Sequence, residues 1–169
     1  MKRVLNILSM LAILAGLASV SAAQEASVAG GTKKAPSSRE VRVYLVALDD
    51  DGKAGRKIGC GDSLVPVTRK IRAGVAPLKA AIQELLLIPH DYDARLKNFW
   101  RGGNLRVRSV ALSRAGVATI RISGAGPTVG GVCDVPRIES QIEETARQFP
   151  NVRRVRVFVN GRTLASVIR

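Results

Sequence analysis

Three stretches of the sequence contain residues that could bind a metal, hold a phosphate or transfer a proton, and none has the pattern that this chemistry requires. Asp49-Asp50-Asp51-Gly52 offers three carboxylates, but a calcium loop alternates its ligands and closes with a glutamate. The glycine-rich stretch 124–131 lacks the Gly-Lys-Ser/Thr ending of a nucleotide-binding loop. His90 is the only histidine and has no partner at metal-ligand spacing. We expect a solvated turn, a loop and a surface histidine, with no catalytic residue, metal or cofactor.

Arginine at alternate positions suggests a binding chemistry instead. In 41–46, 105–123 and 153–162, apolar residues alternate with polar or basic ones, which is the period of a half-buried strand. One face of such a sheet is packed and the other faces water. The alternation puts a set of arginines on the wet face, namely Arg42, Arg106, Arg108, Arg121, Arg154 and Arg156.

Arginine pairs bidentately with phosphate and carboxylate groups. Like charges on one sheet face repel one another, so an anionic partner would relieve a standing repulsion. We therefore predict that these arginines bind an anionic polymer or an acidic protein surface. The alternative is that they form the solvated face of a basic protein.

The stretch Phe99-Trp100-Arg101 has two interpretations. Exposed, it would form a stacking and cation–π platform, and Trp100 would join the ligand-binding residues. Buried, Phe99 or Trp100 would fill the open end of the core, as large aromatic side chains usually do.

Two helices and several strands must position these side chains. Apolar residues at helical spacing predict helices over 76–87, where Pro77 suits the first turn, and from Asp134 to Phe149, where Asp134 can act as the cap. Strands are expected from 41 to 46, from 64 to 71 and from 153 to 162, and a hairpin from 105 to 123. The chain should therefore form a single α+β domain, with a mixed or antiparallel sheet and two helices packed on one face.

The N-terminus resembles an export signal. Met1-Lys2-Arg3 is basic, Val4 to Val20 is apolar, and Ser21-Ala22-Ala23 predicts cleavage of residues 1–23 before Gln24. The alternative, a membrane anchor, has a short apolar run and no basic flank after it. Residues 24–40 are expected to be a flexible linker and 41–169 the domain. We expect an exported, periplasmic, envelope or extracellular protein without a transmembrane segment once mature, which makes nucleic acid an improbable partner despite the formal charge of +14.

Export also affects the interpretation of the two cysteines. In an oxidising compartment, Cys60 and Cys133 can form one disulfide, and closing so long a loop would stabilise the fold by about 4 kcal/mol in the chain-entropy model. Both are surrounded by small residues typical of loops. The alternative is two unrelated free thiols.

The order of these motifs resembles the GerMN domain family, which is named for a bacterial spore-germination protein. The resemblance covers nearly all of 41–162, and its most distinctive part is the final helix and strand, 139–162. Ile88-Pro89 stands where the family often has Gly-Pro, and the cysteine pair and the Phe99-Trp100 stretch are not general to it. The remaining motifs that carry it are 41–45, 64–69, Glu84-Leu85-Leu86, 105–110, 116–120 and Ser123.

The resemblance implies an exported or membrane-tethered envelope domain, similar in fold to ring-building modules, and it supplies no catalytic residues. We expect a non-enzymatic envelope module that binds an anionic polymer or a protein partner through its basic sheet face. The alternative is a self-assembling structural module. An envelope hydrolase is a third hypothesis, for which no family spacing of Ser, His and Asp or of Cys and His is found.

Overall fold

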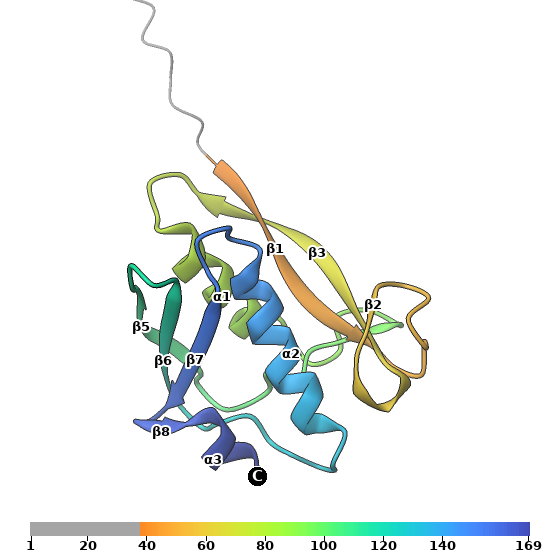
Figure 1. The fold of residues 1–169 in the computed structure, drawn as a ribbon. Helices are drawn as coiled ribbons and strands as arrows, with labels where there is room; N and C mark the ends of the chain where they lie inside the picture. The colour runs from red at the N-terminus through yellow and green to blue at the C-terminus, as the bar shows by residue number, and fades with distance from the viewer. Residues whose placement is uncertain (1–37) are drawn as a thin grey trace, which may run out of the picture. The chain divides into compact units, whose positions relative to one another are not determined.

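The computed structural model describes residues 38–169, whose strands form two four-stranded sheets (Figure 1). The first sheet has the order β2-β3-β1-β4, with β1 at Ser38–Ala47, β2 at Arg56–Lys57, β3 at Ser63–Arg72 and β4 at Leu96–Lys97. The second has the order β5-β6-β7-β8, with β5 at Arg106–Leu112, β6 at Val117–Ser123, β7 at Arg154–Val159 and β8 at Arg162–Thr163. The helices are α1 at Pro77–Leu87, α2 at Asp134–Arg147 and α3 at Leu164–Ile168.

The predicted hairpin is present as β5 and β6, which pair antiparallel. Its turn contains Gly116 at a φ of 78°, where an added Cβ would lie 2.9 Å from the Arg153 side chain, so glycine is needed there. β7 then pairs with β6 in parallel, because α2 intervenes between them in the chain. The second sheet is therefore mixed.

The two long helices lie between the sheets and share one core with both. α1 packs on β1, β3 and β5, and α2 packs on β1 and β7. Buried side chains from each layer meet there, for example Leu45 of β1, Leu85 of α1, Ile142 of α2 and Ile120 of β6. This confirms an α+β fold in which the predicted apolar stripes face inward.

The strands do not join into the one sheet that the sequence suggested. The open edge of β1 is occupied by α2 and its C-cap residue, Gln148, which accepts a hydrogen bond from the Arg42 N–H at 2.8 Å and donates one to the Arg42 carbonyl at 2.6 Å. Thr145 accepts from the Tyr44 N–H at 3.1 Å, and Gln141 donates to the Tyr44 carbonyl at 2.9 Å. Because polar side chains of a helix satisfy this edge, no strand of the second sheet pairs with it.

Two boundaries also differ from the sequence prediction. β1 begins at Ser38, so three residues assigned to the linker pair with the end of β3. The chain ends in α3, a five-residue helix that the sequence prediction missed and that buries Leu164 and Ile168. The expected signal peptide at 1–23 and the rest of the linker lie outside the described residues. Within residues 38–169, no helix is long and apolar enough to cross a membrane.

Candidate anion-binding surface

Five of the predicted arginines lie together on the outer face of the second sheet. The register pairs Thr119 with Arg156 and Arg121 with Phe158, and Ile120 with Val157 on the opposite, buried face. We call the outer set the arginine face, and each of its members is exposed: Arg106, Arg108, Arg121, Arg154 and Arg156.

The charges of the arginine face are not neutralised by neighbouring carboxylates. Within residues 38–169, none of these five arginines forms a salt bridge, although nine salt bridges connect other residues. The sequence explains this, because neither 94–133 nor 145–169 contains an aspartate or glutamate. The second sheet therefore presents positive charge alone.

Neighbouring groups hold some of these arginines in place. The Arg108 Nε donates to the Ser123 Oγ at 2.7 Å, which leaves the terminal nitrogens of its guanidinium for a ligand. The Arg121 guanidinium carbon lies 5.6 Å from the centre of the Phe158 ring, a cation–π contact. Such contacts reduce the side-chain freedom that binding an anion would otherwise remove.

Arg42 is not part of this face. It is exposed on β1, in the first sheet, opposite Thr68 of β3. Alternation correctly gave the side of the strand on which Arg42 lies, but alternation cannot say which strands are neighbours. The structure therefore separates Arg42 from the other five arginines.

Trp100 is buried, so the prediction of an exposed stacking platform that binds a ligand is wrong and the core interpretation is right. Its side chain is 1% exposed and that of Phe99 is 4% exposed. The indole Nε1 donates to the Ile138 carbonyl at 2.8 Å, and the Phe99 N–H donates to the Gln141 side chain at 2.8 Å. Asn98, also buried, bonds to the Leu85 and Ile88 carbonyls and accepts from the Trp100 N–H. The stretch thus joins α1 to α2.

An ionic cluster lies beside the disulfide. Cys60 and Cys133 are joined, as expected, with their Cα atoms 5.9 Å apart. The Arg137 Nε donates to the fully buried Asp62 at 2.6 Å, and its Nη1 donates to Asp134 at 3.2 Å. Burial alone would lower the pKa of Arg137, but the hydrogen bonds and negative charges of Asp62 and Asp134 raise it.

Asp134 does not cap α2 through its side chain as the sequence suggested. The cap position is Cys133, and the Asp134 carboxylate instead accepts from the Gly130 N–H at 2.7 Å, in the loop before the helix. This bond holds the glycine-rich loop against the helix start.

The residues that could do other chemistry have structural partners. The Asp50 carboxylate accepts from Ser63 and from the Ala54 N–H, which lowers its pKa. His90 Nδ1 lies 2.8 Å from the Asn98 carbonyl and Nε2 lies 3.3 Å from Arg101. In the described part of the chain, no three His, Cys, Asp or Glu side chains come together as a metal site would require.

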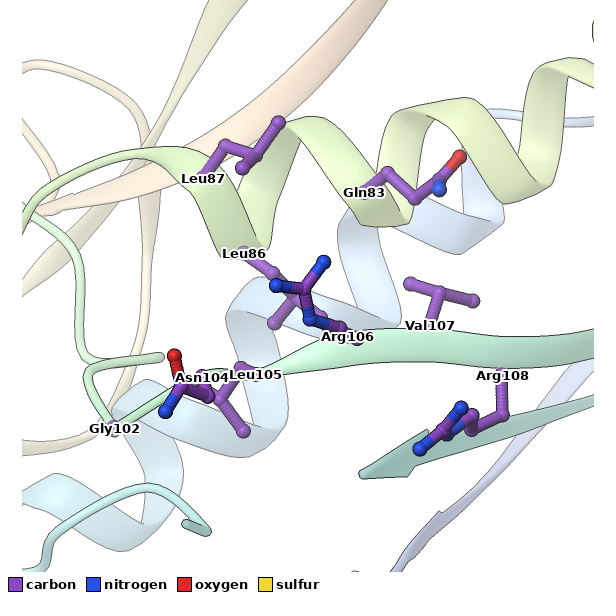
Figure 2. Close-up of a pocket in the computed structure, with 9 residues that line it drawn as sticks. All are labelled: Gln83, Leu86, Leu87, Gly102, Asn104, Leu105, Arg106, Val107 and Arg108. Carbon is purple, nitrogen blue, oxygen red and sulfur yellow. The ribbon is translucent and has the colours of Figure 1, made fainter. Parts of the chain in front are cut away.

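A groove borders the arginine face between α1 and β5 (Figure 2). It has a volume of about 520 Å³ and is lined on the α1 side by Gln83, Leu86 and Leu87. Arg106 and Arg108 line the β5 side, together with 104–105 and Val107. The groove therefore combines the apolar side chains of Leu86 and Leu87 with two arginines that form no salt bridge within residues 38–169.

This groove is not indicated by the sequence. Leu87 lies next to the apolar stripe of α1 but off it, and its side chain is 72% exposed. A single exposed apolar residue is common on protein surfaces and by itself does not indicate a contact surface. Gln83 and Asn104 give no signal either, because amide side chains are common on any surface.

Two solved structures have the same fold. The tandem GerMN domains of the sporulation protein GerM from Bacillus subtilis match with a TM-score of 0.55 and 21% identity, over 83% of this chain and 44% of that one. The first GerMN domain of the same protein matches with a TM-score of 0.52 and 16% identity, over 75% of this chain and 86% of that one. This chain thus spans less than half of the tandem structure.

A comparison with curated proteins finds no match. The family model described as Germane, sporulation and spore germination, matches residues 42–165, which contain β2 to β8, α1 and α2 in full and parts of β1 and α3. The chain therefore belongs to the Germane family of GerMN-type domains.

Proposed function

We propose that this chain is a non-enzymatic binding module of the cell envelope, and that its arginine face holds an anionic partner. The observation that supports this most directly is the set of five exposed arginines on one sheet face, none of which forms a salt bridge within residues 38–169. Membership of a family described by sporulation and spore germination agrees with a role in the envelope. The N-terminal sequence, which resembles an export signal, supports the same location.

Arginine suits this role better than lysine would. Its planar guanidinium can donate two parallel hydrogen bonds to a carboxylate or phosphate, and it is less strongly hydrated than an ammonium group. Adjacent strands repeat such groups across the sheet, so one extended anion can contact several of them. Affinity should then fall steeply as salt is added, because exposed charges are screened over about 10 Å at 0.1 M ionic strength.

The test compares two triple variants of equal charge. Arg106→Gln, Arg108→Gln and Arg156→Gln neutralise three positions of the arginine face. Arg39→Gln, Lys70→Gln and Arg72→Gln neutralise three exposed positions of the first sheet. We expect the first variant to bind a sulfated polysaccharide and an acidic peptide roughly tenfold more weakly than the wild type, and the second to lose much less.

Equal losses in the two variants would mean that net charge alone attracts the anion, and the arginine face would not be a site. Both variants should keep the circular dichroism spectrum and thermal midpoint of the wild type, since all six side chains are exposed.

A further inference from the structure

We propose that the groove between α1 and β5 binds an extended, acidic segment of a partner protein, which lies along the outer edge of β5. The inference rests on the proposed function, because Arg106 and Arg108 belong to both the arginine face and the groove. It narrows the anionic partner to a protein. The edge of β5 and the amides of Gln83 and Asn104 bind the segment's backbone, and the two arginines bind its carboxylates.

The outer edge of β5 is open. β5 is the terminal strand of its sheet, and in an antiparallel pair alternate residues direct their N–H and C=O groups away from the partner strand. In residues 38–169, the backbone of Arg106–Leu112 bonds only to β6. These groups are available to an extended chain, and main-chain hydrogen bonds of this kind provide affinity in strand addition.

The edge of β1 shows what a covered edge looks like in the same molecule. There the side-chain amide of Gln148, the C-cap residue of α2, bonds both the N–H and the carbonyl of one strand residue, Arg42, and also donates to the Thr145 carbonyl. Gln83 is an exposed amide on α1, directed along the groove beside β5 (Figure 2). An extended segment in the groove would receive from Gln83 the type of contact that β1 receives from Gln148.

The charges that line the groove favour an acidic segment over a basic one. Arg106 projects from β5 toward α1 in Figure 2, and Arg108 projects toward β6, where it bonds Ser123. No carboxylate lines this groove. A second groove of about 320 Å³ beside β7 contains Glu139 and Glu143 as well as Arg156, so its lining, unlike that of the first groove, is of mixed charge.

The same charges oppose a second copy of this chain as the occupant. Pairing two β5 edges would bring arginines of one copy against those of the other, and like charges on neighbouring strands destabilise their pairing. Basic edge residues thus discourage self-association while leaving an acidic chain free to bind.

The irregularity in β5 limits how far the segment can pair. The register shifts between Val107 and Ser109, so Arg108 has no residue opposite it on β6. A bulge ends regular pairing and redirects the side chain at that point. The segment therefore pairs along the start of β5, and Leu86 and Leu87 contact its apolar side chains across the groove.

The experiment uses a capped peptide in which glutamate and leucine alternate, its copy with N-methyl groups at alternate residues, and a sulfated polysaccharide. These probes are titrated into the mature chain, into Gln83→Ala with Leu87→Ala, and into Arg121→Gln with Arg156→Gln. The first pair of substitutions lies in the groove and changes no charge. The second pair lies on the arginine face outside the groove.

We expect the groove variant to bind the peptide roughly tenfold more weakly, a loss of one or two good contacts. N-methylation should weaken binding to the wild type by a similar factor, because it removes backbone donors. Polysaccharide binding should depend on Arg121 and Arg156 and not on the groove.

Two results would overturn the inference and leave the proposed function standing. In one, the peptide binds the groove variant as tightly as the wild type and loses affinity only in the Arg121 and Arg156 variant. In the other, only the polysaccharide binds, so that the partner is a polymer without a peptide backbone. Failure of both probes to bind the wild type would overturn the proposed function as well.

Discussion

At the scale of single residues, Arg137 joins the two buried carboxylates of the ionic cluster. It bonds to Asp62 on the first sheet's side of the disulfide and to Asp134 at the start of α2. Its guanidinium carbon also lies 4.9 Å from the centre of the Phe99 ring. A buried ion pair adds little over a well-packed apolar pair, but removing one partner leaves the other charge buried and unpaired.

We therefore expect Arg137→Met to lower the free energy of unfolding by about 3 kcal/mol, since it leaves the fully buried Asp62 without a cation, whereas Asp134 keeps its salt bridge to Arg101 at 3.5 Å. Urea denaturation followed by circular dichroism measures the loss. The matched control is Arg147→Met, because Arg147 pairs with Glu143 on the surface of the same helix and its side chain is 48% exposed. That variant should lose less than about 1 kcal/mol. A similar loss in both variants would contradict the structural role of the cluster.

At the scale of elements, the sequence predicted what each segment is more reliably than where it lies. Alternation identified the long strands β1, β3, β5, β6 and β7 and their buried sides, and helical spacing located α1 and α2, because these periods are local properties of the chain. The two-residue strands β2, β4 and β8 are too short to show a period and were not predicted. Which strands pair depends on contacts distant in sequence. The edge of β1 is satisfied by Gln141, Thr145 and Gln148, and nothing in the spacing of those residues distinguishes a strand-covering stripe from an ordinary polar helix face.

In the candidate site too, local patterns could be predicted from the sequence and contacts between distant segments could not. Five arginines could be assigned to one face because β6 and β7 alternate regularly and β5 alternates from Arg106 to Arg108, before its irregularity, whereas Arg42 could not be excluded without knowing its sheet. The groove beside β5 could not be predicted at all, because it requires the end of α1 to be placed against a strand that follows it by about twenty residues.

The two leucines near the end of α1 provide a test of this element. Leu85 is fully buried and Leu87 is 72% exposed. Leu85→Ala should lower the free energy of unfolding by about 3 kcal/mol, the cost of lost apolar contacts and of the cavity left behind. Leu87→Ala should change it by less than about 0.5 kcal/mol. Thermal and urea unfolding of both variants measure the difference, and comparable losses would show that α1 is rotated from the position described here.

At the scale of the whole described domain, the disulfide cross-links two segments that lie far apart in the sequence. It joins the loop between β2 and β3 to the residue before α2, 73 positions along the chain. The disulfide therefore keeps the start of β3 and the start of α2 close together in the unfolded chain as well as in the folded one.

Replacing both cysteines by serine should lower the free energy of unfolding by about 4 kcal/mol, because the open chain gains conformational entropy when unfolded. The measurement is urea unfolding of the Cys60→Ser and Cys133→Ser double variant beside the oxidised wild type. Wild type treated with a reductant is the control and should move toward the variant. If oxidised and reduced proteins unfolded at the same urea concentration, the cross-link would not constrain the unfolded chain.

The uneven placement of carboxylates gives the domain an electric dipole moment whose positive pole lies at the second sheet, since neither 94–133 nor 145–169 contains an acidic residue. In the field of a negatively charged surface, a dipole experiences a torque that turns its positive pole toward that surface before any atoms touch. A domain released near such a surface would arrive with the second sheet leading. Added salt would then slow productive encounters by randomising the angle of approach, an effect separate from any weakening of the bound state.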